Sequence, residues 1–380
     1  MKILIIVGIY PPDIGGPASF VPKIANLYSD NSHEVTVVCL TDVQSEDVEK
    51  YKVVRISRHQ NLLIRWLKTI FIILKNGRDA NLLFVNGLPM ESYIANLFLR
   101  KKVIRKIVGD WAWERGMNKK LINESFDDFQ NKKHGLHLEV AKFSRGWTAK
   151  KAKLVITPSQ HLSTIVHKWG VKKKNLKVIY NGTEIYKSTS SEIVPSQEPF
   201  TFLTVGRIAP WKNIPTIVNA LKIYKNEGGR FKYYIVGSGP DKDYLKELVA
   251  DYGLQNEIEF TGQLKKPELL NYYKKASVYI QASSYEGLPH VILEAISHNL
   301  SIISTPIGGT NEILLGGKNG WVWDLKNNVK PEQDQLIKII NTISNNPRDD
   351  QIKKHNAFNY LNQNFDEEKN FKEYLEIVNI

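Results

Sequence analysis

The sequence predicts an α/β protein of two domains, each with a parallel sheet that helices cover on both faces. At 380 residues the chain exceeds one ordinary hydrophobic core, so two domains are expected. Short apolar runs alternate with helical patterns, which is typical of parallel strands joined by crossover helices. This alternation occurs once before and once after about residue 190. The hydrophobic content of 42% indicates a globular chain.

The first half begins with the apolar run Met1–Val7, which Pro11-Pro12 soon interrupts. No small-residue cleavage site follows this run, so we expect a first strand and not a signal peptide. Further strands are predicted at 34–40, 52–56, 81–86, 103–108, 153–157 and 176–180, and helices at 20–31, 61–76 and 159–168. Residues 117–147 form a polar, partly helical excursion.

The turn after the first strand runs from Gly8 to Pro17 and contains Gly15-Gly16. It lacks the Gly-x-Gly-x-x-Gly fingerprint, which argues against a nicotinamide enzyme. The two glycines allow a ligand to approach the backbone closely at the carboxyl end of the strand. A plain flexible turn is the alternative. Cys39 is the single cysteine, which excludes an internal disulfide and a cysteine metal cluster and suits a buried thiol in a cytoplasmic protein.

A polar run between Lys187 and Pro199 is rich in Ser and Thr and is predicted to be the linker. The expected domains are therefore residues 1–186, joined by a last helix at about 366–380, and residues 187–365. In the second domain, strands are predicted at 200–205, 233–236, 258–260 and 276–281, with a helix starting near Asp243.

The stretch from Ala282 to Ala295 organises the second domain. It joins a buried strand to an apolar helix through a loop with Gly287 and Pro289, and Pro289 suits the first helical position. Free N–H groups at a helix start favour an anion. Glu286 and Glu294 flank this start, and each carboxylate can accept hydrogen bonds from paired hydroxyls. The stretch therefore predicts a phosphate seat between two hydroxyl clamps, as a nucleotide sugar requires; solvated glutamates are the alternative.

A second charged loop follows strand 200–205, where Arg207 and Lys212 stand five residues apart. Together they can neutralise a diphosphate, Arg through its planar fork and Lys as a point charge. Two exposed surface charges would be the alternative interpretation. The loop and the stretch from Ala282 to Ala295 supply complementary groups for one ligand.

These motifs resemble those of the retaining glycosyltransferases of the GT-B fold, family GT4. The resemblance implies two facing Rossmann-like domains and a C-terminal helix that crosses back to the first domain. It implies that Glu286 holds the donor sugar, that Glu294 holds the ribose, and that Arg207 and Lys212 bind the diphosphate. The donor site implied by the family comprises Gly15, Gly16, Arg207, Lys212, Gln263, Leu264, Glu286, Gly287, Leu288, Pro289, His290, Val291 and Glu294.

The family often carries a histidine near residue 110, where this chain has Asp110 followed by Trp111 and Trp113. Asp110 is expected to orient a sugar hydroxyl or the attacking hydroxyl, and with Glu286 it is the candidate catalytic residue. The tryptophans are either a platform for a sugar ring or part of the core. A suitable Asp-x-Asp motif is absent from the sequence, so no metal is expected to be needed.

The implied reaction moves a sugar from a nucleoside diphosphate sugar, with a UDP-sugar favoured, to an acceptor hydroxyl with retention. No further cofactor is expected. A sugar-nucleotide epimerase of the same fold is the alternative. A nucleic-acid binder is favoured only by the basic pI of about 9.4, and no recognised binding motif accompanies the basic residues, so no nucleic-acid partner is expected.

The positive charge is uneven along the chain. Residues 1–183 carry 30 Lys and Arg against 15 Asp and Glu, and the remaining residues carry 22 against 24. Such a basic half suits an anionic membrane surface or a phosphorylated lipid. The helix at 61–75 has a wide apolar surface with basic residues, which indicates either a core helix or an interfacial helix. A cytoplasmic enzyme, peripheral on the inner face of the membrane and acting on a lipid-linked or cell-surface glycan acceptor, is therefore expected.

Overall fold

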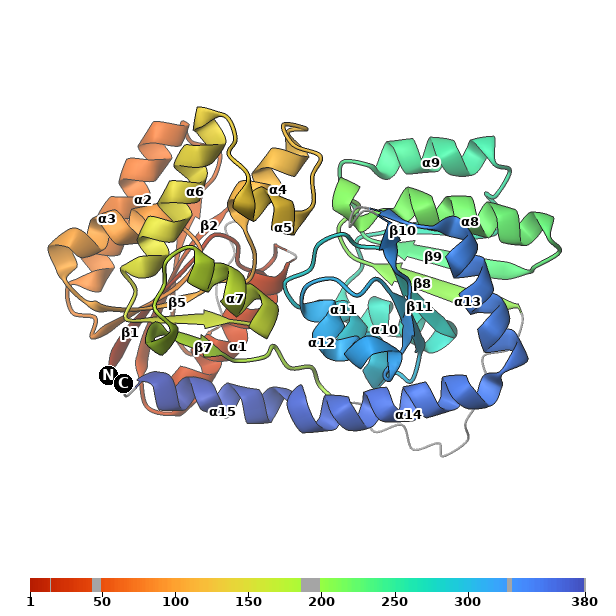
Figure 1. Ribbon diagram of the computed structural model, residues 1–380. Helices are drawn as coiled ribbons and strands as arrows, with labels where there is room; N and C mark the ends of the chain where they lie inside the picture. Colours follow the sequence, from red (N-terminus) through yellow and green to blue (C-terminus); the bar gives the residue numbers. More distant parts are fainter. Residues whose placement is uncertain (14, 43–48, 186–198, 327–329, 379–380) are drawn as a thin grey trace. The chain divides into compact units, whose positions relative to one another are not determined.

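A computed structural model describes residues 1–13, 15–42, 49–185, 199–326 and 330–378 (Figure 1). Contacts between Cα atoms divide the chain into two compact units. The first contains residues 1–108, 134–179 and 368–380, and the second contains residues 109–133 and 180–367. The linker predicted between Lys187 and Pro199 lies outside the described residues except for Pro199.

The first unit contains a seven-stranded, wholly parallel sheet in the order β3-β2-β1-β4-β5-β6-β7. Its strands are β1 (Lys2–Val7), β2 (Glu34–Thr41), β3 (Lys52–Ser57), β4 (Leu82–Asn86), β5 (Lys102–Lys106), β6 (Leu154–Thr157) and β7 (Leu176–Val178). The predicted strands are confirmed, with ends that differ by one or two residues. Cys39 is fully buried in β2.

Helices cover both faces of this sheet: α1 (Gly16–Asp30), α2 (Leu62–Gly77), α3 (Pro89–Leu99), α6 (Leu136–Lys150), α7 (Gln160–Lys168) and α15 (Glu367–Val378), with the 3-10 turn η1 (Lys173–Asn175). Successive side chains of β1 point to opposite faces. Ile3, Ile5 and Val7 pack in a core with α1 and α15, whereas Leu4 and Ile6 pack in a core with α2 and α3. This two-sided burial explains the continuous apolar runs of the strands.

The second unit repeats the pattern in a six-stranded parallel sheet of order β10-β9-β8-β11-β12-β13. The strands are β8 (Phe200–Val205), β9 (Phe231–Val236), β10 (Ile258–Gly262), β11 (Val278–Gln281), β12 (Ser301–Ser304) and β13 (Trp321–Val322). A separate antiparallel pair joins β14 (Leu325–Lys326) to β15 (Lys330–Pro331).

The helices of the second unit are α4 (Trp111–Asn118), α5 (Phe126–Asn131), α8 (Ile214–Asn226), α9 (Lys242–Asp251), α10 (Lys266–Lys275), α11 (His290–Ser297), α12 (Gly309–Leu314), α13 (Gln333–Asn345) and α14 (Pro347–Asn364), with the 3-10 turns η2 (Pro210–Lys212) and η3 (Leu315–Gly317). Phe200 and Phe202 of β8 pack in a core with α8 and α13. Leu203 and Val205 pack on the other face in a core with α11 and α14.

The last two helices belong to different units. Ala357 and Leu361 of α14 pack in the core of the second unit, whereas Tyr374 and Ile377 of α15 pack in the core of the first. The buried Lys106 of β5 donates from Nζ to the Tyr374 hydroxyl at 2.6 Å, which anchors α15. The prediction of two parallel-sheet domains with a final helix returning to the first is therefore confirmed.

Helix α2 is not the fully buried core helix that its apolar pattern allowed. Ile70 and Ile73 face the core, but Leu62, Leu63 and Phe71 are each more than 60% exposed. Helix α2 carries more apolar side chains than the sheet can cover. In the part of the chain that the structure describes, no helix has both the length and the apolar character needed to cross a bilayer.

Candidate functional site

The sheet topology places the carboxyl ends of β8 and β11 side by side, at the point where an open parallel sheet forms a crevice. These two strands are neighbours, with Val278 opposite Phe202 and Tyr279 opposite Leu203. The strand order reverses between them, since β9 and β10 lie beyond β8 and β12 beyond β11. In open parallel sheets, ligands bind outside the strand ends at such a switch point. The predicted phosphate loop follows β8 and the predicted glutamate loop follows β11, so the topology brings both to one place.

Lys212 and Glu286 form an ion pair at this crevice, with Lys212 Nζ 2.6 Å from Glu286 Oε1. Their side chains are 16% and 12% exposed, so water screens the pair less than it would at the surface. Two further bonds hold the loops together: Ser284 N donates to Trp211 O at 2.8 Å, and Asn213 Nδ2 donates to Ala282 O at 2.9 Å.

Arg207 lies on the same loop and is exposed, with its guanidinium 6.0 Å from the centre of the Trp211 ring. The turn after β9 packs against this loop. Ile208 N donates to Ser238 O at 3.0 Å, and a Cβ atom on Gly237 would lie 1.9 Å from the carbonyl oxygen of Gly206. Gly237 also has a φ of +138°, so only glycine permits this close approach.

Helix α11 begins at His290. The sequence predicted Pro289 as the first helical residue, but Pro289 is the N-cap residue. No side chain caps this end among the described residues. Gly287 lies against the start of α12, where a Cβ atom on Gly309 would lie 2.2 Å from Gly287 O. The helix start is thus fixed by backbone packing and presents its first N–H groups without a side-chain cap.

The other predicted donor residues extend from this start along the second unit. Leu288 and Val291 pack in the core beneath α11, and Glu294 accepts a hydrogen bond from the Tyr273 hydroxyl at 2.8 Å. Gln263 is exposed and follows β10 directly, while Leu264 packs against the core. Their positions at strand ends are those that a nucleotide site in this type of sheet uses.

Gly15 and Gly16 belong to the first unit. Gly15 is the N-cap of α1 and Gly16 its first residue. They follow β1, next to which the order of the first sheet also reverses. Nothing lies within 4 Å of a Cβ atom built on Gly16, so the start of α1 has open space in front of it. This position is the switch point of the first sheet.

Asp110 is fully buried and caps α4. One carboxylate oxygen accepts a hydrogen bond from Ala112 N at 3.1 Å, and the other accepts one from Gln130 Nε2 at 3.0 Å. Its own N–H donates to the Tyr285 hydroxyl at 3.0 Å. These bonds connect α4 with α5 and with the residue that precedes Glu286.

An aromatic cluster attaches residues 109–133 to the second unit. Trp113 packs against Trp211 and Tyr285 with ring centres 5.7 and 4.7 Å apart, and Phe126 lies 4.4 Å from Tyr285. Trp113 is 1% exposed. It is therefore a core residue, and of the two alternatives for this tryptophan the exposed platform for a sugar ring is excluded.

Glu114 is a member of the site that the sequence analysis did not identify. It is half-buried on α4, one turn after its cap Asp110. Burial raises the pKa of its carboxyl to about 7; the charge of Arg207 lowers it, the charge of Glu286 raises it and that of Lys212 lowers it. Its place between a capping aspartate and the phosphate loop depends on tertiary packing, and no motif marks it.

Two cations, Arg207 and Lys212, thus lie with the carboxyls of Glu286 and Glu114 at a switch point between strands. The start of α11, which no side chain caps, lies at the same strand ends. This set can neutralise a diphosphate and hold hydroxyl groups on either side of it. Among the described residues, no group of three or more His, Cys, Asp or Glu side chains is placed to hold a metal ion. These are the groups that the sequence analysis predicted for a diphosphate and the sugars on either side of it.

Comparisons with known proteins agree with this prediction. Residues 14–187 match the sequence model "Glycosyltransferase Family 4", and residues 187–360 match "Glycosyl transferases group 1". The chain belongs to this glycosyltransferase family and is a glycosyltransferase of the GT-B fold.

Individual relatives support the assignment. An uncharacterized glycosyltransferase of Methanocaldococcus jannaschii is 28% identical, with 99% of this chain and 98% of the relative covered. The amylovoran biosynthesis glycosyltransferase AmsK of Erwinia amylovora is 28% identical over 33% of this chain and 32% of its own. The crystal structure of Anabaena HepE in complex with UDP and glucose has a TM-score of 0.78 at 21% identity, with 100% of this chain and 99% of that chain covered.

Replacing Glu114 by Gln is expected to make the protein more stable at pH 8 than the native protein, but not at pH 5. A carboxyl whose pKa is raised in the fold binds more protons folded than unfolded between about pH 4.5 and 7. Its contribution to the free energy of unfolding therefore falls as the pH rises through this window, by on the order of 2 kcal/mol. Urea unfolding at both pH values measures the difference.

The exposed Glu227, at the end of α8, provides the control. Glu227→Gln should show the same difference from the native protein at pH 5 and pH 8. An equal effect of Glu114→Gln at the two pH values would contradict the raised pKa.

Proposed function

We propose that the enzyme transfers a sugar from a UDP-sugar to an acceptor hydroxyl of a lipid-linked or cell-surface glycan, with retention of the anomeric configuration. The observation that carries this proposal is the contact of Lys212 with Glu286 at the β8–β11 switch point, with Arg207 on the same loop. A cation for the diphosphate and a carboxylate for the sugar are thereby held within one hydrogen bond of each other.

In this proposal the donor diphosphate lies between Arg207, Lys212 and the N-terminus of α11. Fixed positive groups there stabilise the negative charge that the leaving phosphate gains as its bond to the sugar breaks. Glu286 accepts hydrogen bonds from hydroxyls of the donor sugar, and Glu294 accepts them from the ribose. Glu286 exchanges part of its contact with Lys212 for these hydroxyls when the donor binds.

The chemical step is a front-side displacement. The acceptor oxygen bonds to the anomeric carbon on the face from which the diphosphate oxygen departs, and the departing phosphate takes the acceptor's proton. The charge of Glu286 then supports the positive charge that develops on the sugar. Asp110 was expected to contact a hydroxyl directly. Its carboxylate is buried and accepts two hydrogen bonds within the protein, which favours a positioning role in which it fixes α4 and therefore Glu114.

The protonation of Glu114 affects the charge of the site. When Glu114 is neutral, the group formed with Arg207, Lys212 and Glu286 has a net charge of +1, and when Glu114 is ionised the net charge is zero. A positive site favours a dianionic diphosphate. The raised pKa of Glu114 therefore helps the site to bind its donor at neutral pH.

The choice of UDP is supported by the HepE structures, which contain UDP, UDP-glucose or UDP with glucose. A polysaccharide acceptor is supported by relatives such as AmsK, named for amylovoran biosynthesis, and by the fold of WaaB, a lipopolysaccharide outer core galactosyltransferase. The family match gives no support to the sugar-nucleotide epimerase that the sequence left as an alternative.

An apolar face of the first unit supports peripheral membrane binding. Its exposed side chains come from the adjoining helices α2, α3 and α6 (Figure 1). They are Leu62, Leu63, Ile64, Leu67, Phe71, Leu97, Phe98, Leu136, Val140, Phe143 and Trp147. Exposed basic residues, including Lys68, Lys75 and Lys150, accompany them. Apolar and basic side chains on one surface are what an anionic lipid interface binds.

The phosphate loop is tested by Arg207→Gln and Lys212→Gln. A thermal-shift panel of UDP-, GDP- and ADP-sugars should show stabilisation of the native protein by a UDP-sugar, because a ligand that binds only the folded state raises the melting temperature. Each variant should lose this shift and lower kcat by about 100-fold or more. Lys338→Gln, an exposed change on α13, should alter neither, and full turnover by both loop variants would refute the proposed site.

Metal independence is a second expectation, because two protein cations and a helix end are proposed to balance the leaving diphosphate. Transfer should proceed at an unchanged rate after the enzyme has been treated with EDTA. A loss of activity that Mg²⁺ or Mn²⁺ restores would show that a metal is needed.

Membrane binding is tested by flotation with vesicles. The protein should float with vesicles that contain phosphatidylglycerol and not with pure phosphatidylcholine, since the basic residues need an anionic surface. Leu63→Ser/Phe71→Ser should reduce the floated fraction several-fold. Ile352→Ser removes a comparably exposed side chain from α14 and serves as the control; equal flotation with both lipids would contradict the proposal.

A further inference from the structure

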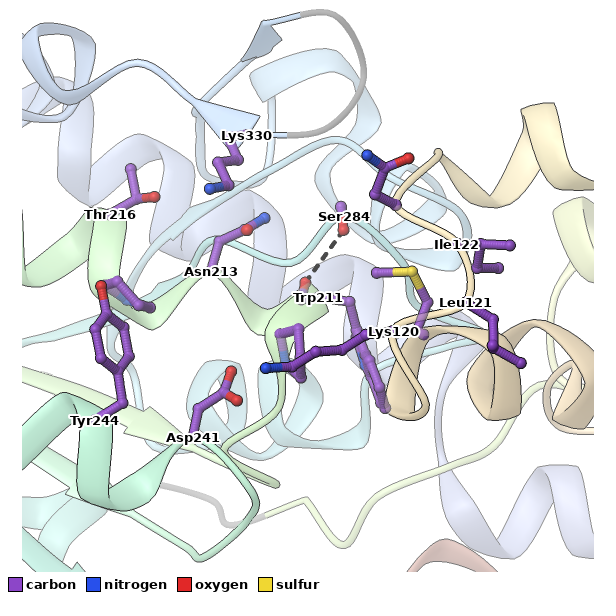
Figure 2. Close-up of a pocket in the computed structure, with 14 residues that line it drawn as sticks. Lys120, Leu121, Ile122, Trp211, Asn213, Thr216, Asp241, Tyr244, Ser284 and Lys330 are labelled. Atoms are coloured by element: carbon purple, nitrogen blue, oxygen red, sulfur yellow. Dashed lines mark hydrogen bonds between the residues drawn. The ribbon is translucent and has the colours of Figure 1, made fainter.

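A cavity of about 600 Å³ lies in the second unit beside the phosphate loop (Figure 2). One wall is the segment after α4, with Met117 and residues 120–123. The opposite wall consists of η2, the start of α8 and the start of α9, and Ser284 and Lys330 complete the lining. Its volume is within the range of about 300–1,000 Å³ that small-ligand sites occupy.

We propose that this cavity binds sugar residues of an oligosaccharide acceptor. The inference rests on the proposed function and deepens it, because it places acceptor binding on the unit that carries the donor loops. It commits to an oligosaccharide, whose hydroxyl-bearing rings match the lining described below.

The lining combines apolar surfaces with a few polar groups. Tyr244 at the start of α9 and Leu121 supply most of the apolar area, with exposed fractions of 56% and 55%, whereas Trp211 is 7% exposed and offers only a small part of its ring. The C–H faces of sugar rings pack on aromatic side chains, which offer a large and rigid apolar surface with a polar edge.

Three polar side chains supply hydrogen bonds for hydroxyl groups: Asp241, Thr216 and Lys120. Figure 2 shows the Lys120 side chain extending toward Asp241. The half-buried carboxylate of Asp241 can accept hydrogen bonds from two hydroxyl groups, and the Lys120 ammonium can donate one to a hydroxyl oxygen. Burial raises the pKa of Asp241, and the charge of Lys120 opposes this rise. The charges of Asp241 and Lys120 balance each other, and Lys330 at the rim leaves the lining with a net charge of +1.

The cavity adjoins the chemistry without overlapping the proposed donor residues. Trp211 directly precedes Lys212, and Ser284 lies two residues before Glu286. Ser284 also contacts Trp211 through both its N–H and its hydroxyl, at 2.8 and 3.3 Å. None of the predicted donor residues lines the cavity. An occupant therefore lies next to the loops that hold the donor, as the part of an acceptor beyond its reacting sugar must.

The test is ¹⁹F NMR of full-length protein labelled with 5-fluorotryptophan, with the Trp211 signal assigned from Trp211→Phe. Maltose, cellobiose and lactose are the probes. At least one should shift the Trp211 signal saturably, and Asp241→Asn should weaken that binding by about tenfold, the effect of losing a charged hydrogen-bond acceptor. Asp243→Asn alters an exposed carboxylate on the same helix outside the cavity and should leave the affinity unchanged.

Thr216→Ala provides a second cavity variant if Asp241→Asn does not fold, and it should also weaken binding. The inference is overturned if no probe shifts the Trp211 signal, if the cavity variants bind as Asp243→Asn does, or if UDP displaces the bound disaccharide. The thermal shift with UDP-sugars is independent of these outcomes. If no UDP-sugar stabilises the protein, the proposed donor is refuted. Saturable binding of a disaccharide in the cavity would then still support the sugar site.

Discussion

The parallel pairing of β8 with β11 is the constraint on which the site depends. The strands are far apart in sequence, and three α-helices and two other strands lie between them along the chain. Because the strand order reverses between them, the loops after β8 and β11 meet with no helix covering the crevice. The Lys212–Glu286 ion pair exists only because these strand ends are neighbours. Glycines in the supporting turns let the backbones approach closely enough to fix the loops.

In the proposed mechanism, contacts with the donor replace the ion pair between Lys212 and Glu286. Lys212 neutralises Glu286, so neither charge is left alone at a site that water reaches poorly. In the proposed mechanism a diphosphate sugar replaces each partner, because its phosphates contact the lysine and its hydroxyls contact the glutamate. Glu114 adds a carboxyl whose pKa burial raises to about 7, so that it changes charge near neutral pH. The proposed mechanism therefore needs no large rearrangement of this group of side chains to receive the donor.

Residues 109–133 show how packing can assign a segment to a unit other than the one that its sequence neighbours form. The segment follows β5 of the first sheet, yet Trp113 and Phe126 pack against Tyr285 and Trp211 of the second unit. The buried Asp110 then caps α4 and fixes its direction. This packing forms one wall of the cavity beside the phosphate loop and brings Glu114 to the site.

The sequence by itself determined the two α/β units, nearly all their strands, the loops that carry Arg207, Lys212 and Glu286, and the helix that carries Glu294. It could do so because apolar runs, glycines and charged residues near strand ends are local signals. The tertiary structure alone decided that α2 leaves its apolar side chains exposed, that Trp113 is buried, and that Glu114 and the cavity adjoin the donor loops. These features depend on which surfaces meet across distant parts of the chain, and aromatic or carboxylate side chains have the same local pattern whether they are buried, exposed or brought into a site.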